Sequence, residues 1–389
     1  MLPISGKRFF LLTTALLPVC VTAQTTGNSG NKDYNPIPVA VPIMSIAPDA
    51  RAAGMGDMGI ATTPDVNSQH YNAAKYPFAE SQMGIGVSVT PWLANLVQDV
   101  NITYGSFFYR IGKMQSIGVS LRYFSLGEME IMSDQGNFVT VVKPNEFTID
   151  LSYARRFGNH VSAALTPRYI RSDLTGGFVT IDGNTTNIIT PANVFSIDMA
   201  VYYQNTHEDN DYAWGASITN MGTKVAYIKE NTDRYFLPAT LRVGGRYTFN
   251  VDPDNSIMVG LELGKLLVPT PPIRDSGQIV LGKNNAVGAI EGLFQSFYDA
   301  PYGWQEEMSE VIVNGGVEYG YRKLFFARMG YFHDSKRKGN RRYITFGAGI
   351  KYNFIGLNVS YLFPFTTIDP LSNTLRVSLF FDFNLSRRI

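Results

Sequence analysis

The stretch ITFGAGIKYNF, residues 344–354, places an apolar side chain at every second position. Ile344 and Phe346 flank Thr345, and the alternation continues to Phe354. Because successive side chains of a strand point to opposite faces, one face of this segment is apolar and the other is polar or small. A strand of about ten such residues is long enough to cross a bilayer at a tilt. The stretch is therefore typical of a transmembrane β-barrel strand.

The same alternation recurs along the chain and predicts fourteen strands. They are expected at 82–90, 98–109, 114–124, 146–156, 160–171, 194–205, 211–220, 239–249, 255–265, 311–322, 324–334, 342–354, 356–364 and 374–385. Tight connections around Gly112, Gly158, Asp209, Asp252, Lys323 and Ile355 alternate with long ones at 125–145, 172–193, 221–238 and 266–310. Outer-membrane barrels have an even number of strands, short periplasmic turns and long extracellular loops. We therefore expect an all-β, fourteen-stranded antiparallel barrel in the outer membrane.

Strand polarity also predicts what lines the barrel. Ile149 and Leu151 are expected to face lipid, whereas Asp150 and Ser152 face inward. The same sorting places charges of both signs inside: Arg122, Arg168, Arg242, Arg246, Arg328, Lys351 and Arg376 beside Asp198, Glu262, Glu318 and Asp382. Such a lumen favours internal ion pairs that brace the wall. Pro167 cannot donate to a strand ladder, so a bulge or local break is expected there.

The amino terminus has the features of a secretory signal peptide. Lys7 and Arg8 precede an apolar run at 9–17 that is too short to span a membrane. Small residues follow, and cleavage is expected between Ala23 and Gln24. Residues 1–23 would thus be removed on export.

The single cysteine, Cys20, lies within this peptide, so the mature chain would contain no thiol. Lipidation at Cys20 is an alternative, although the Pro-Val pair before it is a poor match to a lipidation site. The chain has 33 basic and 32 acidic residues, a balance that gives no general attraction to nucleic acid. No clustered metal-ligand spacing is present, and no cofactor is expected.

Two segments do not have the pattern of barrel wall, which divides the mature chain into residues 24–81 and the barrel at 82–389. The first segment cannot span a membrane and is expected to fold into or under the barrel. The second is the loop 266–310, where apolar side chains recur at helical spacing. They are Val287, Ile290, Leu293, Phe294 and Phe297, and they predict an amphipathic helix above the membrane. Its apolar face must be covered by other loops, by lipid or by a partner protein.

The stretch IAPDARAAGMG at 46–56, followed by GIAT at 59–62, PDVNS at 64–68 and NAAK at 72–75, resembles the amino-terminal signature of the PorV family. This family provides an outer-membrane component of the type IX secretion system of Bacteroidetes. The resemblance extends over essentially the whole mature chain, including the ending LRVSLFF at 375–381. One departure is the terminal Arg387-Arg388-Ile389, where barrel-assembly signals commonly carry an aromatic residue.

The resemblance implies a FadL-like barrel whose amino-terminal segment plugs the lumen. It also implies that the protein binds the carboxy-terminal signal domain of secreted cargo, receives it from a SprA/Sov-type translocon barrel and delivers it to a PorU-like sortase, in contact with outer-membrane lipid and lipopolysaccharide. The motif residues Asp49, Arg51, Gly54, Gly56, Asp65 and Asn67 are expected to fix the plug, with Asp49 and Arg51 as a structural pair. Leu293, Phe294 and Phe297 are the candidate partner-binding residues.

An enzymatic role is not expected, although the family has been linked to lipopolysaccharide deacylation. His333, Asp334 and Ser335 form the one local cluster with the residue types of a serine hydrolase. Adjacent residues of a strand point to opposite faces, so these three are not expected to converge. Glycines 54, 56 and 59 lack the flanking strand and helix of a nucleotide site.

Two functions of different class remain open at this point. One is a secretion adaptor that grips protein partners with its outer loops; the other is a FadL-like transporter that conducts a hydrophobic ligand through a gap in the wall. A conduit needs apolar inward positions, and those predicted here are charged, hydroxylated or glycine, which favours the adaptor.

Overall fold

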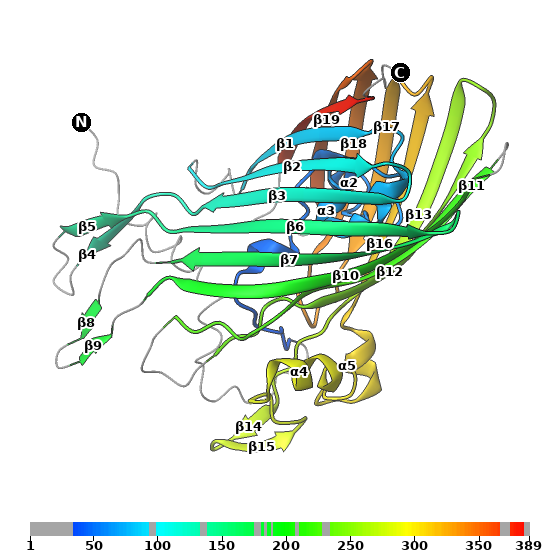
Figure 1. Ribbon diagram of the computed structural model, residues 1–389. Coiled ribbons are helices and arrows are strands. Elements are labelled where there is room, and N and C mark those ends of the chain that lie inside the picture. The colour runs from blue at the N-terminus through cyan, green and yellow to red at the C-terminus, as the bar shows by residue number, and fades with distance from the viewer. Residues whose placement is uncertain are drawn as a thin grey trace.

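The computed structural model describes residues 34–384 except 93–98, 133–137, 175–179, 183–184, 188–189, 207–209, 228–233 and 366–373. The predicted signal peptide and its cleavage site between Ala23 and Gln24, the turn at Asp209 and the terminal Arg387-Arg388-Ile389 lie outside the described residues. Within the described part, fourteen strands form one closed antiparallel barrel (Figure 1). All fourteen predicted strands are confirmed.

The barrel strands follow one another in chain order, and the first pairs with the last through residues such as Val87 and Leu379. They are β1 (Met83–Pro91), β2 (Asn101–Ile111), β3 (Gln115–Ser125), β6 (Asn145–Phe157), β7 (Val161–Asp173), β10 (Ala192–Thr206), β11 (Asn210–Gly222), β12 (Thr240–Asn250), β13 (Asn255–Leu266), β16 (Val311–Tyr321), β17 (Phe325–His333), β18 (Arg342–Tyr352), β19 (Ile355–Pro364) and β20 (Leu375–Phe383). Closure leaves no unpaired sheet edge toward lipid, where a free backbone amide or carbonyl would be costly.

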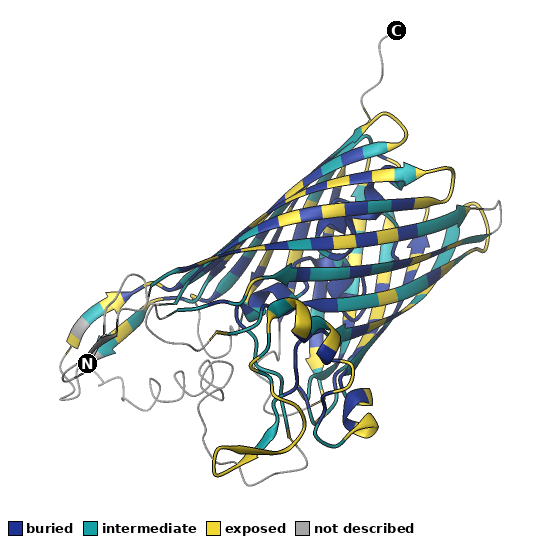
Figure 2. Cartoon of the chain, turned by 60° about the horizontal axis from the view of Figure 1, so that its bottom comes forward, coloured by how far each residue is buried: buried dark blue, intermediate teal, exposed yellow. Residues whose placement is uncertain are grey.

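Burial alternates residue by residue along the strands, as the banding in Figure 2 shows. On β6, Leu151 is 55% exposed, whereas the neighbouring Ser152 is 1% exposed. On β18, Phe346 is 46% exposed and Thr345 is 1% exposed. The predicted assignment of lipid-facing and inward-facing positions is confirmed on both strands.

Short turns gather at one end of the barrel and long connections at the other (Figure 1). Gly112 and Gly158 take positive φ values of 68° and 70° in two of the short turns, a conformation that glycine adopts without strain. The long connections contain small hairpins that the sequence did not predict: β4 (Met129–Met132) with β5 (Phe138–Val142), β8 (Thr180–Asp182) with β9 (Thr185–Asn187), and β14 (Ile273–Asp275) with β15 (Gln278–Leu281). By the rule for outer-membrane barrels, the long connections mark the extracellular end.

The break predicted at Pro167 is confirmed. The β6–β7 ladder runs from Asn145 to Phe157 but lacks the pairs Leu151–Pro167 and Ser152–Thr166. Proline has no N–H to donate across the seam, which explains why these two pairs are missing. The pairing resumes at Tyr153 and Leu165 without a change of register.

Residues 34–81, called here the lumenal segment, run inside the barrel (Figure 1). They bond to inward-facing side chains such as Ser378 and Glu262. The segment contains the short helices η2 (Pro42–Ser45), α2 (Ala50–Ala53), α3 (Ser68–Tyr71) and η3 (Ala73–Phe78). Among the described residues, no helix has the length and apolar character needed to cross a membrane.

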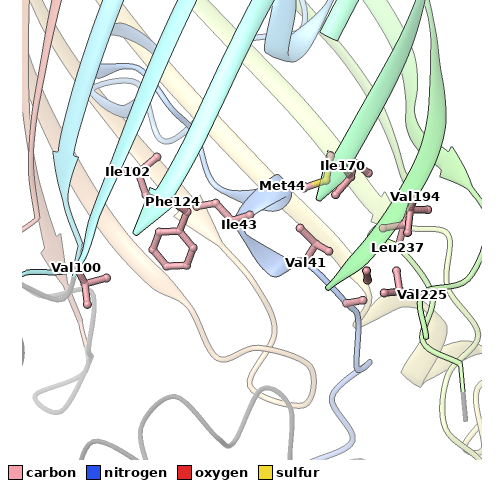
Figure 3. Packing of buried hydrophobic residues seen from close by; sticks show 12 residues of the cluster. Val41, Ile43, Met44, Val100, Ile102, Phe124, Ile170, Val194, Val225 and Leu237 are labelled. Atoms are coloured by element: carbon pink, nitrogen blue, oxygen red, sulfur yellow. The ribbon is translucent and has the colours of Figure 1, made fainter. Parts of the chain in front are cut away.

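At the extracellular end, the lumenal segment packs against the wall through an apolar cluster (Figure 3). Val41, Ile43 and Met44 of the segment contact residues from the ends of several strands. These partners include Val100, Ile102, Phe124, Ile170, Val194, Val225 and Leu237. The cluster joins the lumenal segment to the extracellular end of the wall.

Candidate functional site

Arg51 of α2 is the central anchor of the lumenal segment. Its guanidinium donates from Nε and Nη2 to the two carboxylate oxygens of Glu318 on β16, at 3.1 and 2.9 Å. Its Nη1 donates to Asp65 at 2.8 Å. Such a forked, charge-assisted contact fixes both distance and orientation. It holds the two halves of the lumenal segment together against the wall.

Asp49 does not pair with Arg51, so the predicted structural pair is wrong. The Asp49 carboxylate instead caps α2, accepting from the backbone N–H groups of Arg51 and Ala52 at 3.1 Å each. Its other oxygen accepts from the Tyr71 hydroxyl at 3.0 Å. Helix capping satisfies amide groups that would otherwise be buried without a partner. The sequence places Asp49 two residues before Arg51. It does not show that Asp49 caps α2 or that Arg51 binds Glu318.

Two motif glycines bring backbone against backbone. Gly54 lies so close to Gly347 on β18 that a side-chain carbon at either position would lie about 3 Å from the other backbone, 3.0 and 3.1 Å respectively. Gly56 has φ +69°, and a side-chain carbon there would lie 2.5 Å from the backbone oxygen of Tyr331. Any larger residue would force the chains apart.

Further bonds join the lumenal segment to strands around the barrel. Glu262 on β13 accepts from the N–H groups of Gly59 and Ile60 at 2.8 and 2.9 Å. Asn67 accepts from Ser106 on β2 at 3.2 Å. Other contacts reach β6 through Gln69 and Ser152, β10 through Asn72 and Val201, β18 through Gly56 and Thr345, and β20 through Ala50 and Ser378.

The inward charges form the ion pairs that the sequence predicts. Arg168 bridges Asp150 and Asp198 at 2.5 and 2.9 Å. Arg242 pairs with Glu262 at 2.9 Å. Glu318 also pairs with Arg328, Arg246 with Asp211, and Lys351 with Asp382. A small cavity of about 20 Å³ near Asp57 and Tyr343 has room for about one water molecule.

The second candidate site is the cap loop, residues 267–310 between β13 and β16. It contains α4 (Ala289–Gln295) and α5 (Trp304–Met308) in addition to the β14–β15 hairpin. The predicted helix over 287–297 is confirmed as the shorter α4. Figure 1 shows both helices beyond the extracellular end of β13 and β16.

A buried polar cluster, which the sequence did not predict, stabilises the cap loop. Glu307 accepts from the N–H groups of Asp299 and Ala300 at 2.8 and 2.9 Å and pairs with Lys265 at 3.1 Å. Lys338 binds Glu306 at 2.7 Å and Glu310 at 3.0 Å. The acidic run QEEMSE at 305–310 was the available signal, but its partners lie far away in sequence.

Asp299 is the unusual member of the cluster. Its Oδ2 accepts from the Thr270 N–H at 3.1 Å, whereas Oδ1 is buried without a hydrogen-bond partner. Burial, with added repulsion from Glu310 and Glu307, raises the pKa of Asp299 to about 6.

Helix α4 turns its apolar side chains outward. Ile290 and Phe294 are 75% and 67% exposed, whereas Gly292 and Gln295 are buried. Leu293 is half-buried. We call the exposed apolar side chains of this region the cap surface: Ile290, Phe294, Phe297, Tyr298, Trp304 and Met308. Exposed residues of this size and number are unusual outside binding or membrane contacts.

The candidate hydrolase residues do not converge. His333 lies beside the Tyr331 hydroxyl at 3.1 Å on the outward face. Asp334 is buried on the other side and pairs with Arg341 at 3.1 Å. Among the residues described, no group of three or more His, Cys, Asp or Glu side chains could hold a metal ion.

Comparison with known proteins identifies the family. The model described as "Type IX secretion system protein PorV" matches residues 29–273, which include the lumenal segment and its motif. The chain belongs to the PorV family. It is therefore an outer-membrane β-barrel of the type IX secretion machinery.

Solved structures similar to this PorV-family chain are barrels. The "TodX deltaS2S3 mutant monoaromatic hydrocarbon channel" has a TM-score of 0.51 at 11% identity, covering 86% of this chain and 98% of that chain. The "CymD monoaromatic hydrocarbon channel" has a TM-score of 0.50 at 10% identity, covering 86% and 97%. A Pseudomonas aeruginosa FadL homologue has a TM-score of 0.44 at 11% identity, covering 86% and 98%. The first two show a shared fold. No match to a curated protein sequence was found.

Proposed function

We propose that this PorV-family barrel is a cargo adaptor. It binds the carboxy-terminal signal domain of a secreted protein after passage through a SprA/Sov-type translocon and carries it to a PorU-like sortase. The observation that supports this most directly is a combination: the lumen is occupied by the lumenal segment, whereas large apolar side chains face outward from the cap loop. Binding capacity is therefore expected outside the barrel.

The alternative is transport of a hydrophobic ligand, since TodX and CymD are monoaromatic hydrocarbon channels. A hydrophobic route favours apolar lining, because an apolar ligand cannot satisfy buried charges. Here the lumenal segment lies within the barrel, and buried pairs such as Arg51–Glu318 and Arg168–Asp150 surround it. These features favour the adaptor.

The cap surface is the proposed docking site, with Phe294 and Phe297 at its centre and the half-buried Leu293 beside them. Phe294 and Phe297 lie on one side of α4 and the turn that follows it, at a spacing that brings side chains together. Large apolar anchors of this kind supply most of the free energy at protein interfaces. The buried cluster around Glu307 holds the loop in place, so docking would not require the loop to fold first.

Capture of a purified cargo signal domain tests the proposal. Changing Leu293→Ser together with Phe294→Ser should weaken capture by the barrel in mild detergent by about tenfold or more, since loss of anchor side chains commonly costs a few kcal/mol. Val251→Ser is the matched control, because Val251 is 62% exposed but lies in a short turn at the opposite end. It should leave capture unchanged.

Capture at the wild-type level by the double variant, with a normally folded barrel, would reject the cap surface as the docking site. Capture of a fluorescent hydrocarbon, but of no cargo domain, would favour the transporter instead.

Two further parts of the proposal concern processing and chemistry. We propose that residues 1–23 are removed on export, and intact-mass measurement of the mature protein should place its first residue at Gln24.

We also propose that the barrel has no catalytic role, since His333 and Asp334 point to opposite sides of the wall. Unchanged lipid A in a deletion strain would agree with this.

A further inference from the structure

The outer wall of the barrel carries an apolar groove across β6, β7, β10, β11 and β12. It has a volume of about 600 Å³, and its lining includes Ala163, Leu165, Met199, Ala216 and Ile218. The groove lies on the lipid-facing side of these strands. It runs from the short-turn end of β6 and β7 to Leu241, near the long-loop end of β12. It is separate from both the lumen and the cap surface.

Small side chains in register produce the hollow. Ala163 on β7 and Ala216 on β11 are both paired with Val201 on β10, so they lie in one row across the wall. The adjacent row contains Leu165, paired with Met199, which is paired in turn with Ile218. The short alanine side chains next to these longer ones leave a shallow recess in the outer surface of the wall. A straight apolar chain would fit along such a recess.

The periplasmic side of the groove has the composition of a membrane interface. Tyr203 and Trp214 stack there with ring centroids 5.6 Å apart. Arg155 is paired with Ala163 and points outward with an exposed side chain. In the described part of the chain, no acidic side chain forms a salt bridge with Arg155. Its charge therefore lies free beside the apolar recess.

We infer that this groove binds one phospholipid of the periplasmic leaflet, with an acyl chain over Ala163 and Ala216 and its phosphate at Arg155. Hydrocarbon chains are the apolar material present at this depth, and aromatic residues mark the level of the headgroups. A guanidinium suits a phosphate because it can donate two parallel hydrogen bonds. The inference goes beyond cargo capture and does not depend on it.

The ladder break beside the groove does not let the chain into the barrel. Ser152, which lacks a partner on β7, lies next to Tyr153 at the groove, and its hydroxyl donates to Gln69 of the lumenal segment at 2.7 Å. The seam is thus backed by packed protein. The lipid is expected to stay on the outer surface.

Photolabelling of the whole barrel tests the inference. The barrel is placed in nanodiscs of phosphatidylglycerol that contain a phosphatidylglycerol with a diazirine on one acyl chain. Labelling should concentrate on peptides with Leu165, Met199 and Ile218. Ala163→Phe with Ala216→Phe should reduce it about tenfold, because the two larger side chains fill the recess and the acyl chain loses its packing contacts with the strands.

Ala348→Phe is the matched control, since Ala348 is an exposed outward-facing alanine on β18, and it should not change labelling of the groove. Arg155→Gln should reduce labelling by the phosphatidylglycerol probe but not by a diacylglycerol carrying the same diazirine. Uniform labelling around the wall that the Ala163→Phe, Ala216→Phe double variant does not change would overturn the inference and assign the contact to ordinary surrounding lipid. A protein cross-linked at the groove in native membranes in place of lipid would also overturn it.

Discussion

At the scale of single residues, Glu318 connects the barrel wall to the lumenal segment. Its carboxylate accepts from Arg51 at 2.9 Å and from Arg328 at 2.6 Å, and all three side chains are nearly inaccessible. Arg51 also pairs with Asp65, whereas the salt bridge of Arg328 is with Glu318. Loss of this acid leaves a buried cation at Arg328 without its counter-charge, which is strongly unfavourable.

Glu318→Gln is therefore expected to lower the free energy of unfolding by about 3–5 kcal/mol, the range found when one member of a buried pair is removed. Urea unfolding in lipid vesicles, followed by tryptophan fluorescence, measures this. Glu80→Gln is the matched control: Glu80 pairs with Lys323 at 3.1 Å, but both side chains are largely exposed. That change should cost about 0–1 kcal/mol. Similar losses for the two variants would contradict a buried anchor.

Residue types could be predicted where one physical rule fixes them. Lipid on one side requires an apolar face, so the outward position of Leu151 and the inward position of Ser152 followed from alternation alone. The partners of Asp49 and Arg51 did not follow, because Glu318 lies far along the chain and no local pattern links it to them. Long-range pairing is a property of the closed barrel.

At the scale of elements, the cap loop depends on the protonation of Asp299. Burial raises the pKa of this carboxyl from 3.8 to about 6. The folded loop therefore binds a proton at a pH where the unfolded loop does not, and the contribution of Asp299 to stability falls as pH rises through this window. Above about pH 6 the buried charge is unfavourable.

Asp299→Asn should consequently slow amide hydrogen exchange in α4 and the turn after it at pH 8. The asparagine oxygen can keep the bond from the Thr270 N–H, and its amide replaces the oxygen that lacks a partner. The difference between variant and wild type should shrink at pH 5, where wild-type Asp299 is largely protonated. An equal difference at both values would mean that charge is not the cause.

Strands were easier to predict than loop elements for a physical reason. A membrane strand must alternate over its whole length, whereas the β14–β15 hairpin is exposed on both faces and shows no such pattern. Helix α4 was predictable from apolar spacing, but the side it buries was not. Gly292 and Gln295 face the protein, and the apolar side chains point away from it.

At the scale of the whole molecule, orientation follows from the short turns and long loops. Ser276→Cys in the β14–β15 turn should react with an impermeant maleimide on intact cells, and Asn159→Cys in the β6–β7 turn should not. Both residues are exposed, so accessibility within the protein does not distinguish them. The unsubstituted chain gives the background. Labelling at Asn159→Cys alone would reverse the orientation.

The sequence indicated a polar lumen but could not show how fully it is occupied. Inward charges are compatible with an open aqueous channel or with a packed interior, since both satisfy polar side chains. What decides between them is close contact between segments distant in sequence, as at Gly330 on β17. A side-chain carbon at Gly330 would lie 2.0 Å from the backbone nitrogen of Gly56.

Gly330→Leu should therefore push the lumenal segment from its place, because backbone atoms cannot move aside as a flexible side chain would. If that segment is what closes the barrel, the variant should conduct ions in planar bilayers, whereas the wild type should not. Gly315→Leu is the matched control on the next strand: a side-chain carbon there has no neighbour nearer than 3.9 Å. It should remain closed. A contrary result is a Gly330→Leu barrel that conducts no ions although protease cleaves its displaced lumenal segment. In that case the barrel wall and the apolar cluster near Phe124 close the lumen without Gly54 and Gly56 in place.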